Sequence, residues 1–360
     1  MTTRYGLIGA GMMGQEHIRN LALLEGTELA AVADPNSTMR EQSRQLAGPA
    51  CVGYEHHQQM LAAEKLDALV VASPNHTHHP VLSDVLDAGL PILCEKPLGI
   101  SQSECADLEK KVADAGVPLW VAMEYRYMPP VQRLLDELHA GSVGHIHMLS
   151  IREHRYPFLE KVGNWNRYEE TSGGTMVEKC CHFFDLMRLI LQSEPTRVYA
   201  SGALNVNHQD ETHLDQPADV IDNAYVIVDF ASGARAMLDI CMFAEGSQWQ
   251  ETISVTGNKA RADAYIPGPL RFAPDGQEVH AEVALSPRAD KKERRWPIPV
   301  DDAILRAGDH HGSTFYQHQK FLNLVRKGGT PEVSVKDGAI AVAVGAAAEK
   351  SIKTGQPVDL

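Results

Sequence analysis

Apolar and polar positions alternate along the first third of the chain in a pattern that predicts strands followed by helices. Short apolar runs, typical of buried strands, occupy residues 4–8, 28–33, 68–72, 91–94 and 119–122. Helical spacing of apolar residues separates several of them, as in residues 80–88 and 101–115. Because strands and helices alternate, we expect a parallel sheet with helices on both faces.

The pattern changes after Met123, where longer segments alternate between apolar and polar positions with a period of two. These segments cover residues 145–154, 197–206, 223–230, 234–242 and 251–255. Turn-forming residues at 231–233 and 256–259 lie between segments, as hairpins require. We therefore expect an open, mainly antiparallel sheet, closed by helices over residues 315–326 and 335–354.

The change of pattern also predicts how the chain divides. A chain of 360 residues is longer than most single cores, so two domains are expected. The first is an α/β domain over residues 1–122 with a doubly wound parallel sheet, and the second is an α+β domain over residues 123–360 with the open sheet.

The charge balance narrows the range of partners. The 47 acidic residues outnumber the 33 basic ones, which gives a formal net charge of −14. This excess repels nucleic acid and anionic membrane surfaces, so we expect neither as a partner. No apolar run is long enough to span a bilayer, and the first strand begins without a preceding signal segment, so we predict a cytoplasmic protein.

Cysteine and histidine show no recognisable metal-binding pattern. None of the six cysteines lies in a CxxC pair, so we expect reduced thiols. The 17 histidines include the group His76, His78 and His79 and the pair His310 and His311. Their spacing matches no known ligand set, and we therefore predict no metal.

A glycine-rich turn follows the first predicted strand and opens the first helix. Residues 9–14 read Gly-Ala-Gly-Met-Met-Gly. In such a fingerprint, Gly9 forms the tight turn, Gly11 lets the backbone approach a pyrophosphate, and Gly14 lets the helix pack closely on the strand. The sequence therefore predicts a Rossmann dinucleotide-binding domain, and a glycine turn without a ligand is the alternative.

The residues around this turn indicate which dinucleotide binds. Met12 and Met13 lie between the glycines, where the helix N-terminus faces the phosphates. Asp34 stands at the end of the second strand, where it would accept hydrogen bonds from the adenosine ribose and repel a 2′-phosphate. We therefore predict NAD as the cofactor, and some tolerance of NADP stays open.

Two further motifs carry a resemblance to a known family. Residues 73–78 read Ser-Pro-Asn-His-Thr-His, and the tripeptide Glu95-Lys96-Pro97 ends a later strand. With the glycine fingerprint, these motifs resemble the glucose-fructose oxidoreductase / inositol dehydrogenase / MocA family over nearly the whole chain. The resemblance implies an enzyme that oxidises or reduces sugars, sugar acids, cyclitols or related polyols, assembled as a homodimer or homotetramer through its open sheet.

The resemblance also implies roles for these residues. Ser73, Asn75 and His78 look like the loop that passes the cofactor, and Glu95 and Lys96 look like the pair beside the nicotinamide. In the family, the lysine hydrogen-bonds the reacting hydroxyl and helps its proton to leave. A surface lysine in a loop is the alternative, but the carboxyl end of a parallel strand is where open α/β sheets bind ligands.

A second group of chemically active residues lies in residues 173–185. One apolar stripe with helical spacing is formed by Met176, Cys180, Phe183, Met187 and Ile190. Glu178, His182 and Asp185 fall on another face of this predicted helix. A carboxylate one turn before a histidine can hold its ring and stabilise the imidazolium, although a polar face in water would give the same pattern.

The family resemblance makes His182 the expected general base. Glu178 takes the place of the usual aspartate of an Asp-x-x-x-His pair, and Lys179-Cys180-Cys181 stand where small apolar residues are common. This departure leaves the orienting partner of His182 open. If Lys179 faces the cleft, it would bind the substrate and favour an acidic sugar.

Other residues match segments that enter the cleft in the family. We expect a substrate-binding role for Tyr125, Arg126, Trp165, Arg167 and His311, with a structural anchor as the alternative for each. His310 and Tyr316 near the last helices are weaker candidates.

The expected reaction is hydride transfer between a secondary hydroxyl and the nicotinamide, with Lys96 and His182 on the hydroxyl. Two alternatives stay open. One is a glycosidase that uses bound NAD only transiently to oxidise a sugar and eliminate its glycosidic bond. The other is an NAD-binding protein without catalysis, because a Rossmann fold does not dictate chemistry.

Overall fold

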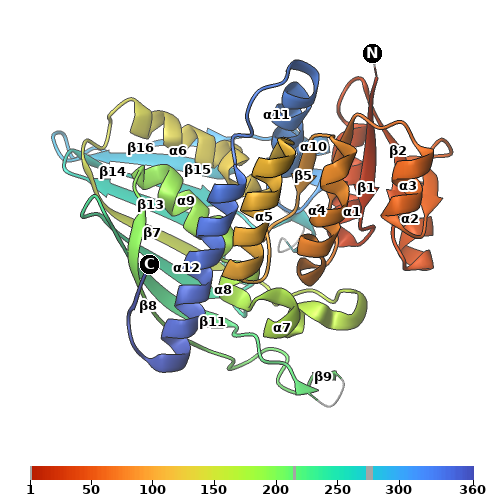
Figure 1. Ribbon diagram of the computed structural model, residues 1–360. Helices are drawn as coiled ribbons and strands as arrows, with labels where there is room; N and C mark the ends of the chain where they lie inside the picture. The colour runs from red at the N-terminus through yellow and green to blue at the C-terminus, as the bar shows by residue number, and fades with distance from the viewer. Residues whose placement is uncertain (1, 214–215, 273–278) are drawn as a thin grey trace.

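The computed structural model describes residues 2–213, 216–272 and 279–360. Two sheets lie side by side, each with helices packed on it (Figure 1). Within the described residues, no helix combines the length and the apolar character needed to cross a membrane. All six cysteines carry free thiols.

The first sheet is the predicted doubly wound parallel sheet. Its six strands have the order β3-β2-β1-β4-β5-β6 and all pair in parallel. They are β1 (Thr3–Ile8), β2 (Thr27–Ala33), β3 (Val52–Tyr54), β4 (Ala68–Val71), β5 (Ile92–Cys94) and β6 (Leu119–Val121). Since the order reverses between β1 and β4, a crevice for a ligand is expected at the carboxyl ends of these two strands.

Helices connect the strands of this sheet. They are α1 (Met12–Ala22), α2 (Ser37–Ala47), α3 (His57–Ala63), α4 (His78–Val85) and α5 (Gln102–Ala115), with short 3₁₀ turns η1 (Asn75–Thr77) and η2 (Leu86–Ala88). The sequence pattern did not predict α2, β3 or α3. Strand β3 is only three residues long and has no fully buried residue, so it shows no apolar run.

The second sheet has nine strands in the order β16-β15-β14-β13-β7-β12-β11-β8-β17. They are β7 (Ile146–His154), β8 (Pro195–Ala203), β11 (Asn223–Phe230), β12 (Arg235–Cys241), β13 (Glu251–Gly257), β14 (Ala260–Ile266), β15 (Ala281–Pro287), β16 (Arg294–Ile298) and β17 (Val358–Asp359). A separate two-strand ladder joins β9 (Thr212–His213) and β10 (Gln216–Pro217). The sheet is mainly antiparallel, as expected, but β7 and β12 pair in parallel.

Among the described residues, helices cover only one face of the nine-stranded sheet. Helix α6 packs on β14, α9 on β7 and α12 on β8 (Figure 1). The helices and turns of this half are η3 (Glu124–Tyr127), α6 (Pro129–His139), η4 (Val162–Arg167), α7 (Glu169–Ser172), α8 (Thr175–Glu178), α9 (Cys181–Leu191), η5 (Leu270–Phe272), α10 (Asp302–Ala307), α11 (Ser313–Lys327) and α12 (Val335–Thr354).

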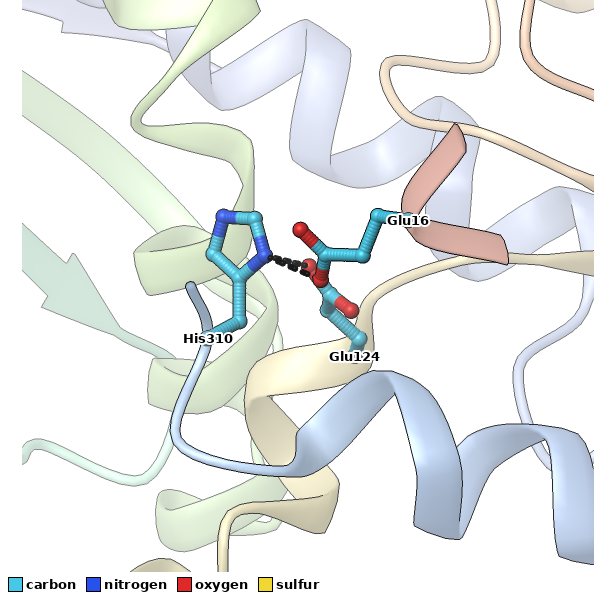
Figure 2. Close-up of side chains that lie close together, drawn as sticks. All are labelled: Glu16, Glu124 and His310. Atoms are coloured by element: carbon cyan, nitrogen blue, oxygen red, sulfur yellow. Dashed lines mark hydrogen bonds and ion pairs between the residues drawn. The ribbon is translucent and has the colours of Figure 1, made fainter. Parts of the chain in front are cut away.

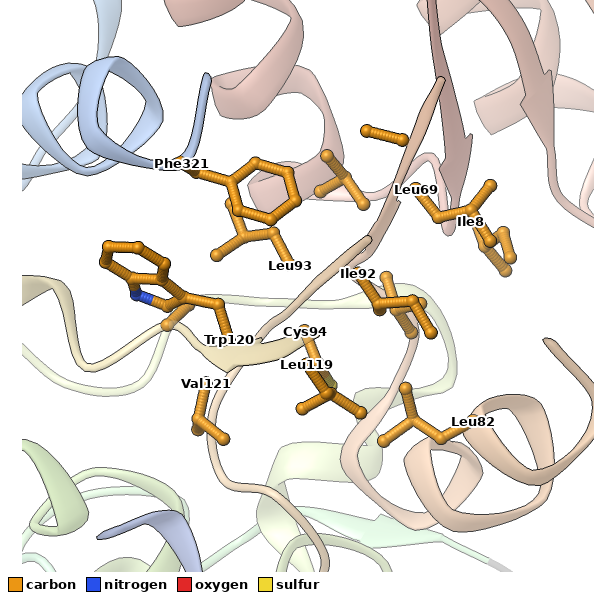
Figure 3. Close-up of a cluster of buried hydrophobic side chains, with 14 of the residues drawn as sticks. Ile8, Leu69, Leu82, Ile92, Leu93, Cys94, Leu119, Trp120, Val121 and Phe321 are labelled. Carbon is orange, nitrogen blue, oxygen red and sulfur yellow. The ribbon is translucent and has the colours of Figure 1, made fainter. Parts of the chain in front are cut away.

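The last two long helices also complete the core of the first sheet. Phe321 of α11 packs edge-to-face on Trp120 of β6, with ring centroids 6.2 Å apart (Figure 3). Val335 and Ala341 of α12 belong to the same buried cluster. Helix α12 therefore lies between the two sheets, packing on α5 on one side and on β8 on the other.

Candidate active site

The glycine turn has the geometry that the fingerprint predicts. Gly9 has φ +94°, and a Cβ there would lie 2.5 Å from the backbone of Ala72 and Ser73. A Cβ on Gly14 would lie 2.2 Å from the carbonyl oxygen of Gly9. Around Gly11, in contrast, no atom lies within 4 Å of the position that a Cβ would take. The two outer glycines thus close the turn, and the middle one leaves the space that a pyrophosphate needs.

Asp34 lies next to this turn. Its carboxylate accepts hydrogen bonds from the backbone N–H of Ala10 and of Asn36, both at 2.7 Å. Met12 is exposed and Met13 half-buried at the start of α1, whose first N–H groups have no side-chain cap. The free helix N-terminus and the carboxylate at the end of β2 fit the phosphates and the adenosine ribose of NAD.

The loop after β4 is fastened to its neighbours by the residues that were expected to pass the cofactor. Asn75 donates from Nδ2 to the carbonyl oxygen of Ser172 at 3.1 Å. His78 is fully buried, with Nδ1 2.7 Å from the carbonyl oxygen of Pro97 and Nε2 2.9 Å from that of Ser73. These side chains fix the shape of the loop.

Glu95 follows β5 and begins a buried chain of polar contacts. Its Oε1 lies 3.1 Å from Nε2 of His17, and Nδ1 of His17 lies 2.8 Å from Nε2 of His318. Burial alone would raise the pKa of Glu95, but the hydrogen bond and the charge of His17 lower it below its usual value. Glu95 is thus a buried anion directly beside Lys96.

Lys96 lies at the junction of the two halves. Its Nζ donates to the carbonyl oxygen of Glu178 at 3.0 Å and lies 3.8 Å from Oε1 of the same residue. Burial alone would lower the pKa of Lys96, but the charge of Glu178 raises it above its usual value. Lys96 is therefore a protonated hydrogen-bond donor at the carboxyl edge of the parallel sheet.

A second lysine, Lys161, which precedes η4, also lies here and was not among the residues expected from the sequence. Its Nζ lies 3.4 Å from Oε1 of Glu178 and 4.3 Å from the ring centroid of Trp165. Burial would raise the pKa of Glu178, but the charges of Lys96 and Lys161 lower it to about 2. No local sequence pattern marks Lys161. Its partners Glu178 and Trp165 lie 17 and 4 residues further along the chain, and these two spacings belong to no single helical or strand period.

His182 is held by an aromatic ring. Its imidazole stacks on Tyr125 with centroids 4.1 Å apart and planes 7° apart. Its Nδ1 is buried and has no hydrogen-bond partner among the described residues. Burial, and then the charges of Lys96 and Lys179, lower the pKa of His182 well below its usual value. The ring is therefore neutral and able to accept a proton.

The expected contact between Glu178 and His182 does not form, because the carboxylate faces Lys96 and Lys161 instead. The single helix predicted here is divided into α8 and α9. At the break, the N–H of Cys180 bonds to the carbonyl of Thr175, five residues earlier, which widens the helix by one residue. All residues of the predicted apolar stripe are nevertheless buried in the second core.

The polar residues of this segment are also buried. Lys179 is 4% exposed; its Nζ lies 2.9 Å from Oε1 of Glu153 and donates to the hydroxyl of Tyr125. Asp185 accepts hydrogen bonds from Nε and Nη2 of Arg126. The substrate-binding role expected for Lys179 stays a prediction, because its ammonium lies between Glu153 of β7 and the hydroxyl of Tyr125, the ring on which His182 stacks.

The remaining expected substrate-binding residues differ in their surroundings. Tyr125 is 2% exposed beneath His182, and Arg126 is occupied by its bidentate contact with Asp185. Arg167 is 3% exposed and bonds to Oε2 of Glu211 at 2.9 Å. These three side chains anchor the site, whereas Trp165 is partly exposed beside the ring of His76.

A buried cluster joins the first helix to the segment before α11 (Figure 2). Nδ1 of His310 lies 3.1 Å from a carboxylate oxygen of Glu16 and 3.1 Å from one of Glu124. Thr314 donates to Glu16 at 2.8 Å. Burial would lower the pKa of His310, but the charges of Glu124 and Glu16 raise it to about 9. One ligand atom from each of Glu16, Glu124 and His310 lies within 4.8 Å of the others.

His311 lines a cavity of about 340 Å³. The cavity lies between the ends of β7 and β14 and the segment before α11, and its walls include Arg155, Tyr156, Gln250, Phe272 and Asp309. Nε2 of His311 is buried without a partner among the described residues, and burial lowers the pKa of His311 to about 4. Arg155 lines this cavity and is also near enough to the reaction site for its charge to help lower the pKa of His182.

Comparison with known proteins gives matches along almost the whole chain. Residues 3–123 match the family model described as "Oxidoreductase family, NAD-binding Rossmann fold". Residues 136–360 match the model described as "Oxidoreductase family, C-terminal alpha/beta domain". Together the two models cover both sheets.

Individual relatives agree with these matches. The rhizopine catabolism protein MocA of Rhizobium meliloti is 35% identical over 197 residues, which are 54% of this chain and 58% of that protein. Myo-inositol 2-dehydrogenase of Thermotoga maritima is 26% identical over 359 residues, 99% of this chain and 98% of that enzyme. The crystal structure of a "probable dehydrogenase" from Thermotoga maritima superposes with a TM-score of 0.78 at 25% identity, covering 99% of this chain and 98% of the other.

Proposed function

Because this chain belongs to the glucose-fructose oxidoreductase / inositol dehydrogenase / MocA family of NAD-dependent oxidoreductases, we propose that it transfers a hydride between NAD and a secondary hydroxyl of a sugar, sugar acid or cyclitol. The observation that carries this proposal is the pairing of a protonated Lys96 with a neutral His182. Of all charges near His182, that of Lys96 lowers its pKa most. In this proposal the hydrogen-bond donor Lys96 and the proton acceptor His182 act on the same hydroxyl.

In this proposal the two halves have separate tasks. Residues 1–122 hold the dinucleotide, with Gly9, Gly11 and Gly14 around the pyrophosphate and Asp34 on the adenosine ribose. Residues 123–360 bind the substrate. When bound, the nicotinamide supplies the acceptor for the hydride.

The protein side chains then handle the hydroxyl. Lys96 donates a hydrogen bond to the hydroxyl oxygen and stabilises the negative charge that grows on it. His182 accepts the hydroxyl proton on its imidazole, which the Tyr125 ring keeps in one orientation. Glu178, held as an anion by Lys96 and Lys161, accepts a hydrogen bond from a neighbouring hydroxyl of the substrate. Loss of the proton and of the carbinol hydride leaves a ketone.

The named relatives support the substrate class. Proteins named inositol 2-dehydrogenase from Thermotoga maritima and Rhizobium meliloti match over 99% and 100% of this chain. At 26% identity they support a polyhydroxylated ring or chain as substrate without fixing which one. Six free thiols support a cytoplasmic location, because reducing compartments keep cysteines in this form.

We further propose a homodimer or homotetramer assembled through the bare face of the nine-stranded sheet. Tyr225 and Ile227 of β11 are 62% and 48% exposed on this face, and Tyr199 of β8 lies directly opposite Ile227. A second copy of this surface would bury these apolar side chains.

A substrate panel tests the catalytic proposal. The purified protein is incubated with NAD and with cyclitols, aldoses, alditols and sugar acids, and NADH is followed by its absorbance. Oxidation of at least one class with formation of NADH is the expected result. Release of an aglycone from a glycoside without net NADH would support the transient-oxidation glycosidase instead, and NAD binding without any turnover would support a non-catalytic protein.

A further inference from the structure

Within one set of ion pairs at the reaction site, cations outnumber carboxylates. Four cationic side chains lie around this site, and they share two carboxylates, Glu178 and Glu153. The cations are Lys96, Lys161, Lys179 and Arg155. Lys96 and Lys161 both approach Oε1 of Glu178, whereas Lys179 and Arg155 both approach Oε1 of Glu153.

Among the described residues, other carboxylates nearby form no ion pair with these four cations, although Glu95 is an anion beside Lys96. Burial raises the pKa of Glu251 to about 7, so it is ionised only in part at neutral pH. Glu16 and Glu124 surround His310, and Glu95 pairs with His17. The whole chain carries a net charge of −14, so the local excess of cations is a property of the site.

Among the four cations, Lys161 is the most available to a ligand. Its side chain is 23% exposed, compared with 14% for Lys96 and 5% for Lys179. An ammonium has three donors, and Glu178, at 3.4 Å, is the only acceptor of the Lys161 ammonium among the described residues. The ammonium itself lies over the ring of Trp165, which is beside the cofactor loop at His76.

Arg155 extends the positive surface toward the cavity. Its side chain lines the cavity of about 340 Å³ and is stacked on Tyr156, 4.4 Å from the ring centroid. Nη1 lies 3.8 Å from Glu153, beyond hydrogen-bond distance. The guanidinium is held by this stacking and by Nε, which donates to the carbonyl oxygen of Tyr156 at 3.2 Å, so that its Nη donors are left for a ligand.

Buried charge that is not balanced is costly, and a ligand of opposite charge removes that cost on binding. The oxidised nicotinamide is itself a cation, so the imbalance grows when the cofactor binds. A neutral cyclitol leaves the excess unchanged, whereas an anionic substrate reduces it by one charge. A carboxylate also fits an ammonium and a guanidinium geometrically.

We propose that the substrate is a polyhydroxylated carboxylate, such as an aldonic or uronic acid, and that Lys161 binds its carboxylate while Arg155 adds positive charge from the cavity wall. This inference rests on the proposed function, in which Lys96 and His182 act on a hydroxyl of the same molecule. Lys161, rather than Lys179, is then the residue that selects an acid, because Lys179 is paired with Glu153.

The test uses matched substrates that differ only in charge. Each pair consists of an aldose or alditol and the corresponding uronic or aldonic acid, measured with NAD at fixed ionic strength. The quantity compared is the ratio of kcat/KM for the acid to kcat/KM for its neutral partner. We expect a ratio well above one in the native protein and a fall of about 10- to 100-fold in Lys161→Met, the range for loss of a charge-assisted hydrogen bond.

Two control variants make the result specific. Lys161→Arg keeps the charge and should retain most of the preference for the acid. Lys110→Met removes an exposed lysine of α5 and should leave the ratio unchanged. A native preference for neutral substrates, or an equal loss on both members of each pair in Lys161→Met, would overturn the inference. So would a rise confined to the KM for NAD, which would assign Lys161 to the cofactor.

A binding measurement separates this inference from the proposed function. In the presence of NADH, acids should raise the Tm of the native protein and not that of Lys161→Met. If acids bind in this way but are never oxidised, the catalytic proposal fails and the anion site stands. If neutral polyols are oxidised and acids neither bind nor react, the anion site fails and the catalytic proposal stands.

Discussion

At the scale of single residues, the chemistry of His182 is set by its neighbours rather than by its own sequence context. Burial and four nearby cations keep the imidazole neutral, and Tyr125 keeps its plane fixed. These cations are Lys96, Lys179, His310 and Arg155. A neutral imidazole is the form that accepts a proton. The same ring exposed on a helix in water would be partly protonated at pH 6.5.

This environment predicts an unusual pH dependence of activity. A base works in its unprotonated form, so activity is lost as pH falls through its pKa. Because the pKa of His182 is lowered, the acidic limb of the kcat profile should lie well below pH 6.5. Initial rates of NADH formation between pH 4.5 and 9 measure this limb, and a limb centred near or above 6.5 would contradict the assignment.

A substitution at the same residue provides the second readout. His182→Ala should lower kcat by about 10²- to 10⁴-fold, the usual contribution of a general base, and change the Kd for NADH by less than about threefold. Lys110→Met serves as the matched surface control. An unchanged kcat would remove His182 from the reaction.

Lys96 and His182 could be predicted from sequence because each belongs to a short motif. Lys161 could not, because its role comes from meeting Glu178 across a loop in which Gly163 and Asn164 both have positive φ. Lys179 lies directly after Glu178 in sequence, and its ammonium lies 2.9 Å from Oε1 of Glu153. Sequence spacing gives no sign of this contact, because Glu153 belongs to a distant strand.

At the scale of elements, the glycine turn of residues 9–14 contains one glycine that the fold requires and another that cofactor binding requires. A Cβ on Gly14 would meet the Gly9 carbonyl at 2.2 Å, whereas a Cβ on Gly11 meets nothing. Gly11 has φ −71°, which alanine adopts readily. The two positions therefore form a natural pair of variants.

We expect Gly14→Ala to destabilise the fold by at least ~2 kcal/mol, because a backbone atom must move to make room. Gly11→Ala should keep the native Tm within about 2 °C and weaken NADH binding about tenfold or more, because its methyl group occupies the pyrophosphate space. Thermal unfolding and NADH fluorescence titration measure the two effects. Loss of stability in Gly11→Ala, or native NADH affinity in Gly14→Ala, would contradict this reading of the turn.

The long elements could be predicted because their hydrophobic periodicity is set by burial on one face. Strands β11 and β12 and helix α12 begin within one residue of the predicted positions. The parallel pairing of β7 with β12 could not be predicted, because a period of two is the same in parallel and antiparallel strands. The short strand β3 has too few buried positions to show any period.

At the scale of the whole molecule, the bare face of the nine-stranded sheet predicts self-association. Tyr225→Glu combined with Ile227→Asp places two charges on this face and should convert an oligomer into a monomer at micromolar concentration. Light scattering after size-exclusion chromatography measures the mass. Leu46→Asp, at an exposed apolar position of α2 in the other half, is the control and should keep the native mass. A native monomer, or an oligomer that survives both substitutions, would contradict the proposed interface.

The change of sequence pattern near residue 122 marks where the first sheet ends but not where its core ends. Phe321, Val335 and Ala341 pack in the same buried cluster as the strands of that sheet, although they come from the last forty residues of the chain. A hydrophobic pattern relates residues that are close in sequence. It therefore predicts that these segments are helices but not the sheet on which the helices pack.

This late contribution bears on how the polypeptide is made. While the ribosome is still translating, the nucleotide-binding half has all six of its strands, yet one flank of its sheet stays uncovered until α11 and α12 leave the exit tunnel. Because α11 and α12 follow the first sheet by about 190 residues in the sequence, the nascent chain exposes an apolar surface to chaperones while the segment between them is made. The half encoded first is thus completed last.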